Sequence, residues 1–149
     1  MSLTLAVPEN YAYVLLAVST IPWLNVFQAF TVGRARKRAG IAYPQAYAEK
    51  QQAAASPDAM RFNCAQRAHA HTLEWVSQII FSTLLAGLRY PILAASLGGL
   101  WVVGRVAFTL GYATGDPAKR HRGGFHIVAA LGLCGTATWT AISMFREII

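Results

Sequence analysis

The sequence predicts an all-α integral membrane protein, a four-helix bundle that forms one domain over residues 1–149. The chain is 55% hydrophobic and 13% charged, whereas soluble domains carry about 25% charged residues. Four apolar segments cover about 11–32, 64–88, 92–112 and 125–145, and a membrane helix needs about 20 such residues. The charges gather between these segments. The net charge of +7 therefore suits a lipid surface or an anionic ligand, and no nucleic-acid partner is expected.

The first two segments flank a basic connection. Residues 11–32 are uncharged, and Pro22 within them is tolerated in a membrane helix. A basic run over 34–38 opens a loop that extends over about 33–60. Asp58 is a candidate N-cap for a second helix that begins near Met60 and becomes strongly apolar only in its second half.

The third segment follows a short break at 89–91. Its glycines, Gly98, Gly99 and Gly104, let helix backbones approach closely. Arg105 lies inside the segment, and a lone arginine there is expected to face the bundle interior. A basic loop over about 113–124 then leads into the fourth segment.

The distribution of Lys and Arg predicts the orientation. Six lie in 33–62 and three in 113–124, against one in 89–91 and one near the C-terminus. Four spans place both basic loops on one side, and the positive-inside rule makes that side cytosolic. The loops at about 33–60 and 113–124 are therefore expected in the cytosol, with both termini opposite.

A polar stripe begins the second helix. At about 100° per residue, one narrow face carries Asn63, Arg67, His71, Glu74 and Gln78. Such a stripe is costly beside lipid unless it faces protein, water or a ligand. Two interpretations stay open here: a structural salt bridge between Arg67 and Glu74, or a ligand site.

A metal site is not expected in this stripe. His69, His71, Glu74 and Cys64 are ligand types. However, His69 and His71 lie about 200° apart on a helix and cannot chelate one ion from one face. The chain offers a single His-x-x-Glu pair, whereas di-metal bundles use several such pairs.

The third helix adds a second polar face. Arg105, Phe108 and Tyr112 follow the spacing i, i+3 and i+7. A tyrosine there is also typical of an interfacial aromatic belt, and the basic loops are typical of topogenic charge. Together these groups suit a small ligand with two carboxylates and one amine, because arginines bind carboxylates bidentately and Glu74 can bind an ammonium. Glutathione has this chemistry, although the residues do not select it uniquely.

Four stretches resemble the membrane-associated eicosanoid and glutathione metabolism family. The central one is Phe62-Asn-Cys-Ala-Gln-Arg-Ala-His-x-x-Thr-Leu-Glu74. Gly33-Arg-Ala-Arg-Lys37 with Tyr43-Pro44 precedes it, and Val103-Gly-Arg-Val106 and Gly111-Tyr-Ala-Thr-Gly-Asp-Pro-x-Lys-Arg120 follow it. The resemblance extends over essentially the whole chain, and the motifs occur in the expected order.

The resemblance implies a four-helix protomer that assembles as a homotrimer and binds glutathione between protomers near the cytosolic face. It implies glutathione transfer to lipophilic electrophiles, reduction of lipid hydroperoxides and, in some members, leukotriene C4 synthesis. By motif, Arg67 and Glu74 match glutathione-binding positions, and Tyr112 matches a binding tyrosine. Arg36, or Lys37 beside it, matches a basic residue from the neighbouring protomer.

The family also has an arginine that stabilises the glutathione thiolate after the third helix. Arg120 is the best match, and an alignment gap of one residue leaves Arg122 as the alternative. A nearby cation lowers the pKa of a thiol from its ordinary value of about 8.5.

Four residues depart from the patterns of relatives. His71 stands where relatives usually have asparagine, His69 replaces a glutamine, Trp75 replaces a tyrosine, and Phe108 lacks a hydroxyl found in other members. These residues stay candidates for binding glutathione, but the changes weaken the expectation of leukotriene C4 synthesis.

Two other functions compete with the enzyme. A non-enzymatic lipid-presenting protein of the same superfamily, like the 5-lipoxygenase-activating protein, would bind a fatty acid without glutathione. A small channel or transporter would use Arg67, Glu74 and Arg105 as a polar path. Membrane lipid is expected as a partner in each case. The resemblance implies the endoplasmic reticulum membrane, with the outer mitochondrial membrane as the alternative.

Overall fold

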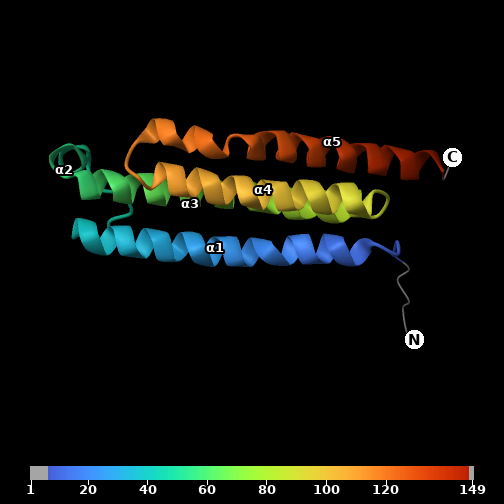
Figure 1. Ribbon diagram of the computed structural model, residues 1–149, viewed down its shortest axis with the longest axis horizontal. Helices are drawn as coiled ribbons and strands as arrows, with labels where there is room; N and C mark the ends of the chain where they lie inside the picture. The colour runs from blue at the N-terminus through green and yellow to red at the C-terminus, as the bar shows by residue number, and fades with distance from the viewer. Residues whose placement is uncertain (1–6, 148–149) are drawn as a thin grey trace.

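A computed structural model describes residues 7–147. Every secondary-structure element in this part of the chain is a helix (Figure 1). Four long helices and two short ones follow one another along the chain. Their bounds are α1 Tyr11–Ala39, α2 Lys50–Ala55, α3 Pro57–Gly87, α4 Pro91–Tyr112, the 3-10 helix η1 Pro117–Gly123, and α5 Phe125–Arg146. The all-α class predicted from the sequence is confirmed.

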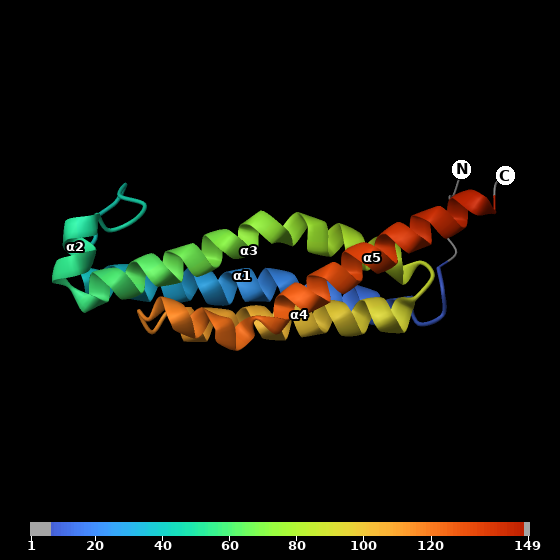
Figure 2. The same cartoon turned by 90° about the horizontal axis from the view of Figure 1, so that it is seen from above.

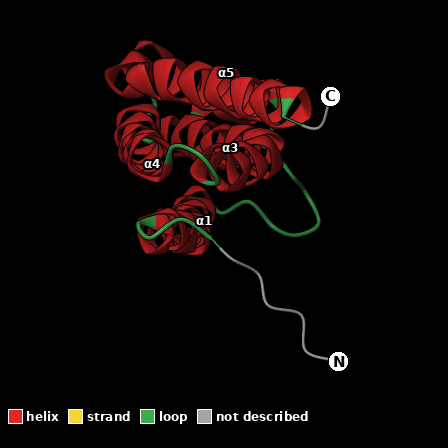
Figure 3. Ribbon diagram, turned by 90° about the vertical axis from the view of Figure 1, so that its right-hand side faces the viewer, coloured by secondary structure: helices red, strands yellow, loops and turns green. Residues whose placement is uncertain are grey.

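The long helices lie side by side in three layers (Figure 3). The pair α3 and α4 forms the middle layer, with α1 packed on one side of it and α5 on the other. Viewed from above, α5 crosses the middle layer obliquely (Figure 2). The end of α1, α2, the start of α3 and η1 all lie at the end of the bundle away from the termini (Figure 1). We call this the basic end, because it carries Arg36 to Arg38 and Lys119 to Arg122.

The bundle is apolar on its outside as well as in its core, which is the arrangement of a membrane protein. Large apolar side chains such as Trp23, Phe81 and Val128 are about two-thirds exposed. Alanines and threonines are frequent among the buried residues, beside large apolar ones such as Trp101 and Leu133. Three helices, α1, α4 and α5, are long and apolar enough to cross a membrane. The chain is thus a multi-pass membrane protein. A fourth span over 64–88 stays a prediction. The α3 helix begins with polar turns, and among the described helices it is not one of those that are both long enough and apolar enough to cross a membrane.

Much of the predicted loop over about 33–60 is helical, so the prediction of an irregular segment there is wrong. The α1 helix continues through the basic run to Ala39 and ends at Gly40, whose φ of 65° is left-handed. Arginine, lysine and alanine are good helix formers, so loss of hydropathy did not end the helix. The 113–124 loop likewise contains η1.

The predicted cap of the second long helix is also wrong. Ser56, not Asp58, is the N-cap of α3, and its hydroxyl accepts a hydrogen bond from the Ala59 N–H. Pro57 occupies the first helical position, where a missing N–H costs nothing. Asp58 lies in the first turn and forms an ion pair with Arg61 at 2.9 Å.

Two glycines bring η1 directly onto α4. A Cβ at Gly123 would lie 2.1 Å from the Gly104 carbonyl oxygen and 2.4 Å from the Phe108 nitrogen. A Cβ at Gly111 would lie 2.2 Å from the Lys119 carbonyl oxygen. Since these neighbours are backbone atoms, only glycine permits this contact, and it fixes η1 against the basic end of α4.

Candidate functional site

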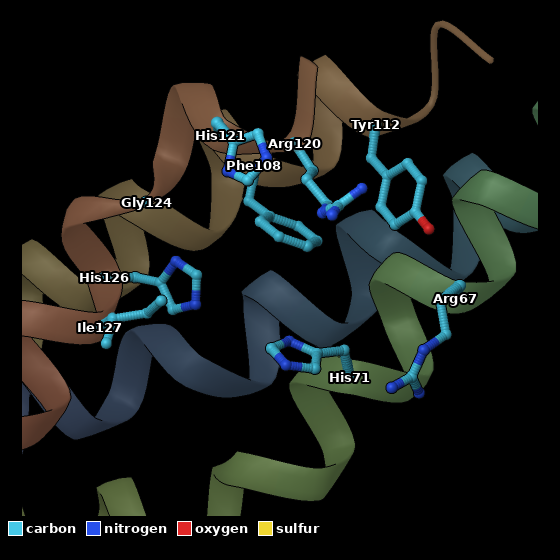
Figure 4. Close-up of a pocket in the computed structure, with 9 residues that line it drawn as sticks. All are labelled: Arg67, His71, Phe108, Tyr112, Arg120, His121, Gly124, His126 and Ile127. Carbon is cyan, nitrogen blue, oxygen red and sulfur yellow. The ribbon is translucent and has the colours of Figure 1, made fainter. Parts of the chain in front are cut away.

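A pocket of about 270 Å³ lies at the basic end, between α3, α4, η1 and the start of α5. Figure 4 shows side chains from these four elements facing a common space. Its lining residues are Arg67, His71, Phe108, Tyr112, Arg120, His121, Gly124, His126 and Ile127.

The α3 wall of the pocket carries an ion pair. The Arg67 guanidinium donates to Glu74 at 2.5 Å and 3.4 Å, two helical turns along the same face. Both side chains remain about half exposed, at 45% and 51%. The salt bridge, one of the two interpretations left open by the sequence, is therefore formed, and it lies on the surface of the protomer at the pocket. An exposed pair contributes little to stability, so its groups stay available to a ligand or a neighbouring chain.

An aromatic cluster forms the floor of the pocket. The rings of His71 and Phe108 stack at 5.7 Å between centroids. Tyr112 lies edge-on to Phe108 at 5.6 Å, and His126 lies edge-on to both Phe108 and His71. The predicted face with the i, i+3, i+7 spacing on α4 is confirmed, because Phe108 and Tyr112 line one pocket and Arg105 lies directly behind them.

Arg105 is 1% exposed, so the expectation that it faces the bundle interior is confirmed. Its guanidinium donates to the Thr72 hydroxyl, the Ala68 carbonyl and ring nitrogens of His71 and His126. It also lies 4.1 Å from the centre of the Phe108 ring. These contacts join α3, α4 and α5 immediately behind the pocket.

The η1 helix supplies the second arginine of the pocket. Arg120 lines it and donates to the Pro117 carbonyl at 2.8 Å. Arg122 is exposed and is not among the lining residues. The side chain of Arg120 therefore lies where it can contact a ligand that also contacts Arg67.

The electrostatics of the pocket favour an anion. Its lining has two arginines, three histidines and a tyrosine, and among the described residues no carboxylate lines it. Glu74, on the rim, is held by Arg67. No group of three potential metal ligands occurs in residues 7–147. The arrangement can bind carboxylates through its arginines and stabilise a developing anion between α3 and η1.

Comparison with known families identifies the group to which the protein belongs. Residues 14–142 match the model of the MAPEG family. The chain belongs to the MAPEG family. The match covers most of the 149 residues and includes every helix that lines the pocket. This family comprises membrane proteins of glutathione and lipid metabolism, both glutathione-dependent enzymes and non-enzymatic members. The resemblance seen in the four sequence motifs is thereby confirmed at the level of the family.

Within this MAPEG chain, several predicted site residues lie together. Arg67, His71, Phe108, Tyr112 and Arg120 line one pocket. Two further candidates adjoin it: Glu74 binds Arg67, and the Trp75 ring lies 6.2 Å from that of His71.

The other predicted residues lie elsewhere in the protomer. His69 and Arg122 are not among the lining residues. Arg36 is 8% exposed, enclosed by the rings of Tyr43 and Phe62, and donates to backbone carbonyls of its own loop. Lys37 is exposed on the outer surface of α1.

The structure adds lining residues that the sequence reasoning missed: His121, Gly124, His126 and Ile127. His126 lies at the start of an apolar segment, and the residues that follow it at i+3, i+4 and i+7 are Ala129, Ala130 and Leu133, so no polar periodicity within the segment marked it. The one available signal was Gly104, because a Cβ there would lie 2.7 Å from the His126 Cβ, and this glycine permits the approach of α5.

Proposed function

We propose that this protein is a glutathione transferase with glutathione-dependent peroxidase activity, acting on lipophilic electrophiles or lipid hydroperoxides. Within the MAPEG family the sequence resembles microsomal glutathione S-transferase 3. One observation carries the proposal. The pocket at the basic end has an arginine on each side, Arg67 on α3 and Arg120 on η1, and no carboxylate among its described lining residues.

The ligand fits this arrangement of charge. Glutathione has two carboxylates and one ammonium, so Arg67 binds a carboxylate while Glu74, beside it, binds the ammonium. Tyr112 and His71 add polar groups to the same pocket. Arg120 lies opposite Arg67 and acts on the thiol, because a guanidinium favours the thiolate over the neutral form.

The chemistry then needs no metal or other cofactor beyond glutathione as co-substrate. The thiolate sulfur attacks an electrophilic carbon, the carbon–sulfur bond forms, and the leaving group departs with its electron pair. With a hydroperoxide, the sulfur attacks the distal oxygen, the O–O bond breaks, and the alkoxide takes a proton to give an alcohol. The resulting sulfenic acid condenses with a second glutathione to give the disulfide and water.

A neighbouring protomer completes the site in this proposal. Arg67 and Glu74 are half exposed on a helix that continues into an apolar segment, and such a pair beside lipid is costly. A homotrimer, as the family resemblance implies, covers this face with α1 of the next protomer. The exposed Lys37 is then the better candidate for the contributed cation, because Arg36 is bound within its own loop. The expected location is the endoplasmic reticulum membrane, with the basic end in the cytosol.

Binding of glutathione to the detergent-solubilised protein tests the proposal. Arg67→Ala should raise the dissociation constant about tenfold or more, since a hydrogen-bonded charge is lost. Arg61→Ala is a matched control: it lies on the same helix, is 51% exposed and also has an acidic partner, but does not line the pocket. Binding of a fatty acid without glutathione would instead support a lipid-presenting protein, and ion flux in liposomes would support a channel.

A further inference from the structure

The acceptors of Arg105 are all neutral groups. Its Nε and Nη2 donate to the Thr72 hydroxyl at 3.0 Å and 2.8 Å, and Nη2 donates to the Ala68 carbonyl at 2.9 Å. Its Nη1 lies 3.1 Å from His71 Nδ1 and 3.3 Å from His126 Nε2. Among the described residues no carboxylate forms an ion pair with it. Arg105 is nonetheless 1% exposed, so within the described chain its guanidinium is solvated by these two imidazoles, these two oxygens and the face of the Phe108 ring.

The contacts of Arg105 and of Gly123 determine the proton positions on the two imidazoles. A guanidinium has five N–H donors and no acceptor. An imidazole nitrogen within hydrogen-bond distance of it must therefore present its lone pair. His71 then has its proton on Nε2, and His126 has its proton on Nδ1. The second assignment agrees with an independent contact, because His126 Nδ1 lies 2.7 Å from the Gly123 carbonyl, which accepts that proton.

Each imidazole connects Arg105 to a different part of the pocket. His71 lines the pocket, and its Nε2–H has no acceptor within residues 7–147, so it is available to a ligand. His126 binds the last residue of η1, the element that carries Arg120. No carboxylate within residues 7–147 forms a hydrogen bond or an ion pair with either histidine. The two rings also pack edge to face, with centroids 6.1 Å apart.

We infer that Arg105 is a positioning residue, which holds His71 as a neutral Nε2–H donor toward the bound anion and, through His126 and Gly123, holds η1 and Arg120 at the pocket. This inference rests on the proposed function for the identity of the anion, glutathione. The proton positions do not depend on the identity of the anion, because they follow from the contacts of Arg105 and Gly123. Arg105 itself is not among the lining residues and acts through the two histidines.

Nitrogen-15 spectra of the histidine rings test the proton positions without any ligand. The full-length protein, labelled at its four histidines, should show His71 protonated at Nε2 and His126 at Nδ1. In Arg105→Met the chemical shifts of the two ring nitrogens of His71 should move toward each other, as they do in an imidazole that exchanges between its two tautomers. His126 should keep its tautomer, since Gly123 still accepts its proton. Arg89→Met, which removes an arginine bound to Glu147 at the opposite end of the bundle, should change neither.

Either of two spectra would overturn the inference: a wild-type His71 protonated at Nδ1, or a His71 signal that is the same in Arg105→Met. A role of Arg105 in packing alone predicts the latter.

A double-mutant cycle on glutathione affinity provides the second test, and it remains decisive if Arg105→Met does not fold. His71→Phe keeps the stacked ring and should weaken binding about tenfold, whereas His71→Asn keeps a donor and should stay within about threefold. Arg105→Lys should also weaken binding about tenfold, but by less than about threefold in the His71→Phe background. Effects that multiply to about a hundredfold would show that Arg105 does not act through His71. Wild-type protein that binds no glutathione would refute the proposed function, while the spectra would still decide the proton positions.

Discussion

Within residues 7–147 two arginines are buried, Arg36 and Arg105, and their partners differ. Arg36 lies between the rings of Tyr43 and Phe62, at 4.2 Å and 4.5 Å from their centres, and donates to the carbonyls of Ile41 and Gln45. All but one of these partners lie within nine residues of it. Arg105 instead contacts α3 and α5 from its place on α4.

The difference separates a local function from a long-range one. Arg36 closes the connection between α1 and α2 onto the end of its own helix, so its loss should affect stability there. Arg105 joins three helices behind the pocket, so its loss should affect ligand binding as well as stability. Both arginines use aromatic faces and neutral acceptors, as buried cations without a carboxylate must.

The contact between η1 and α4 is the most sensitive point of the Arg105 region. Gly123→Ala should lower the free energy of unfolding by about 3 kcal/mol or more, because its Cβ would meet backbone atoms of α4 at 2.1 Å and 2.4 Å. Thermal unfolding in detergent measures this loss. Gly99→Ala on α4 is the control, since a Cβ there meets nothing within 4 Å. Equal stabilities of the two variants would contradict the packing argument.

The two arginines of η1 give the next largest effect, on turnover. Arg120→Ala should lower kcat about a hundredfold while the fold is kept, because it removes a cation that stabilises the thiolate. Arg122→Ala should change kcat less than about threefold, since it does not line the pocket. The measurement is conjugation of glutathione to a lipophilic electrophile. The opposite ranking would assign the thiolate role to Arg122.

Removing the Arg36 contacts should act on stability alone. Arg36→Met keeps the aliphatic packing but loses two hydrogen bonds and two ring contacts, at a cost of about 2 kcal/mol. Limited proteolysis between α1 and α2 should accelerate, while the glutathione dissociation constant changes less than about threefold. A large loss of affinity with unchanged stability would give Arg36, rather than Lys37, the ligand role.

The smallest effect is expected at Lys37, next to Arg36 but exposed. Lys37→Ala should leave the free energy of unfolding within about 0.5 kcal/mol. It should weaken glutathione binding about threefold, as loss of one exposed cation from a neighbouring protomer would. Binding titrations of Lys37→Ala and Arg38→Ala side by side check this, and identical affinities would remove Lys37 from the site.

The sequence was a good guide where a single helix decides the outcome. Hydropathy predicted the long helices, and helical spacing predicted that Arg67 and Glu74 share a face, as their 2.5 Å contact confirms. The same spacing placed Phe108 and Tyr112 together. It was a poor guide to helix ends, because the basic run after residue 32 continues α1 to Ala39.

Tertiary structure decided what the polar residues bind. The apolar residues that follow His126 in the sequence give no sign that it belongs to a polar site. It contacts Arg105 only because Gly104 lets α5 approach α4. Arg36 and Lys37 are adjacent in sequence, yet one is enclosed by Tyr43 and Phe62 and the other is exposed. The sequence by itself determined an all-helical membrane chain with an arginine facing inward. The spacing of apolar residues and the cost of placing a charge in lipid are both properties of a single helix, so they can be read from its sequence. Which neutral groups solvate that arginine depends on close contacts between helices, and only the packed bundle decides those contacts.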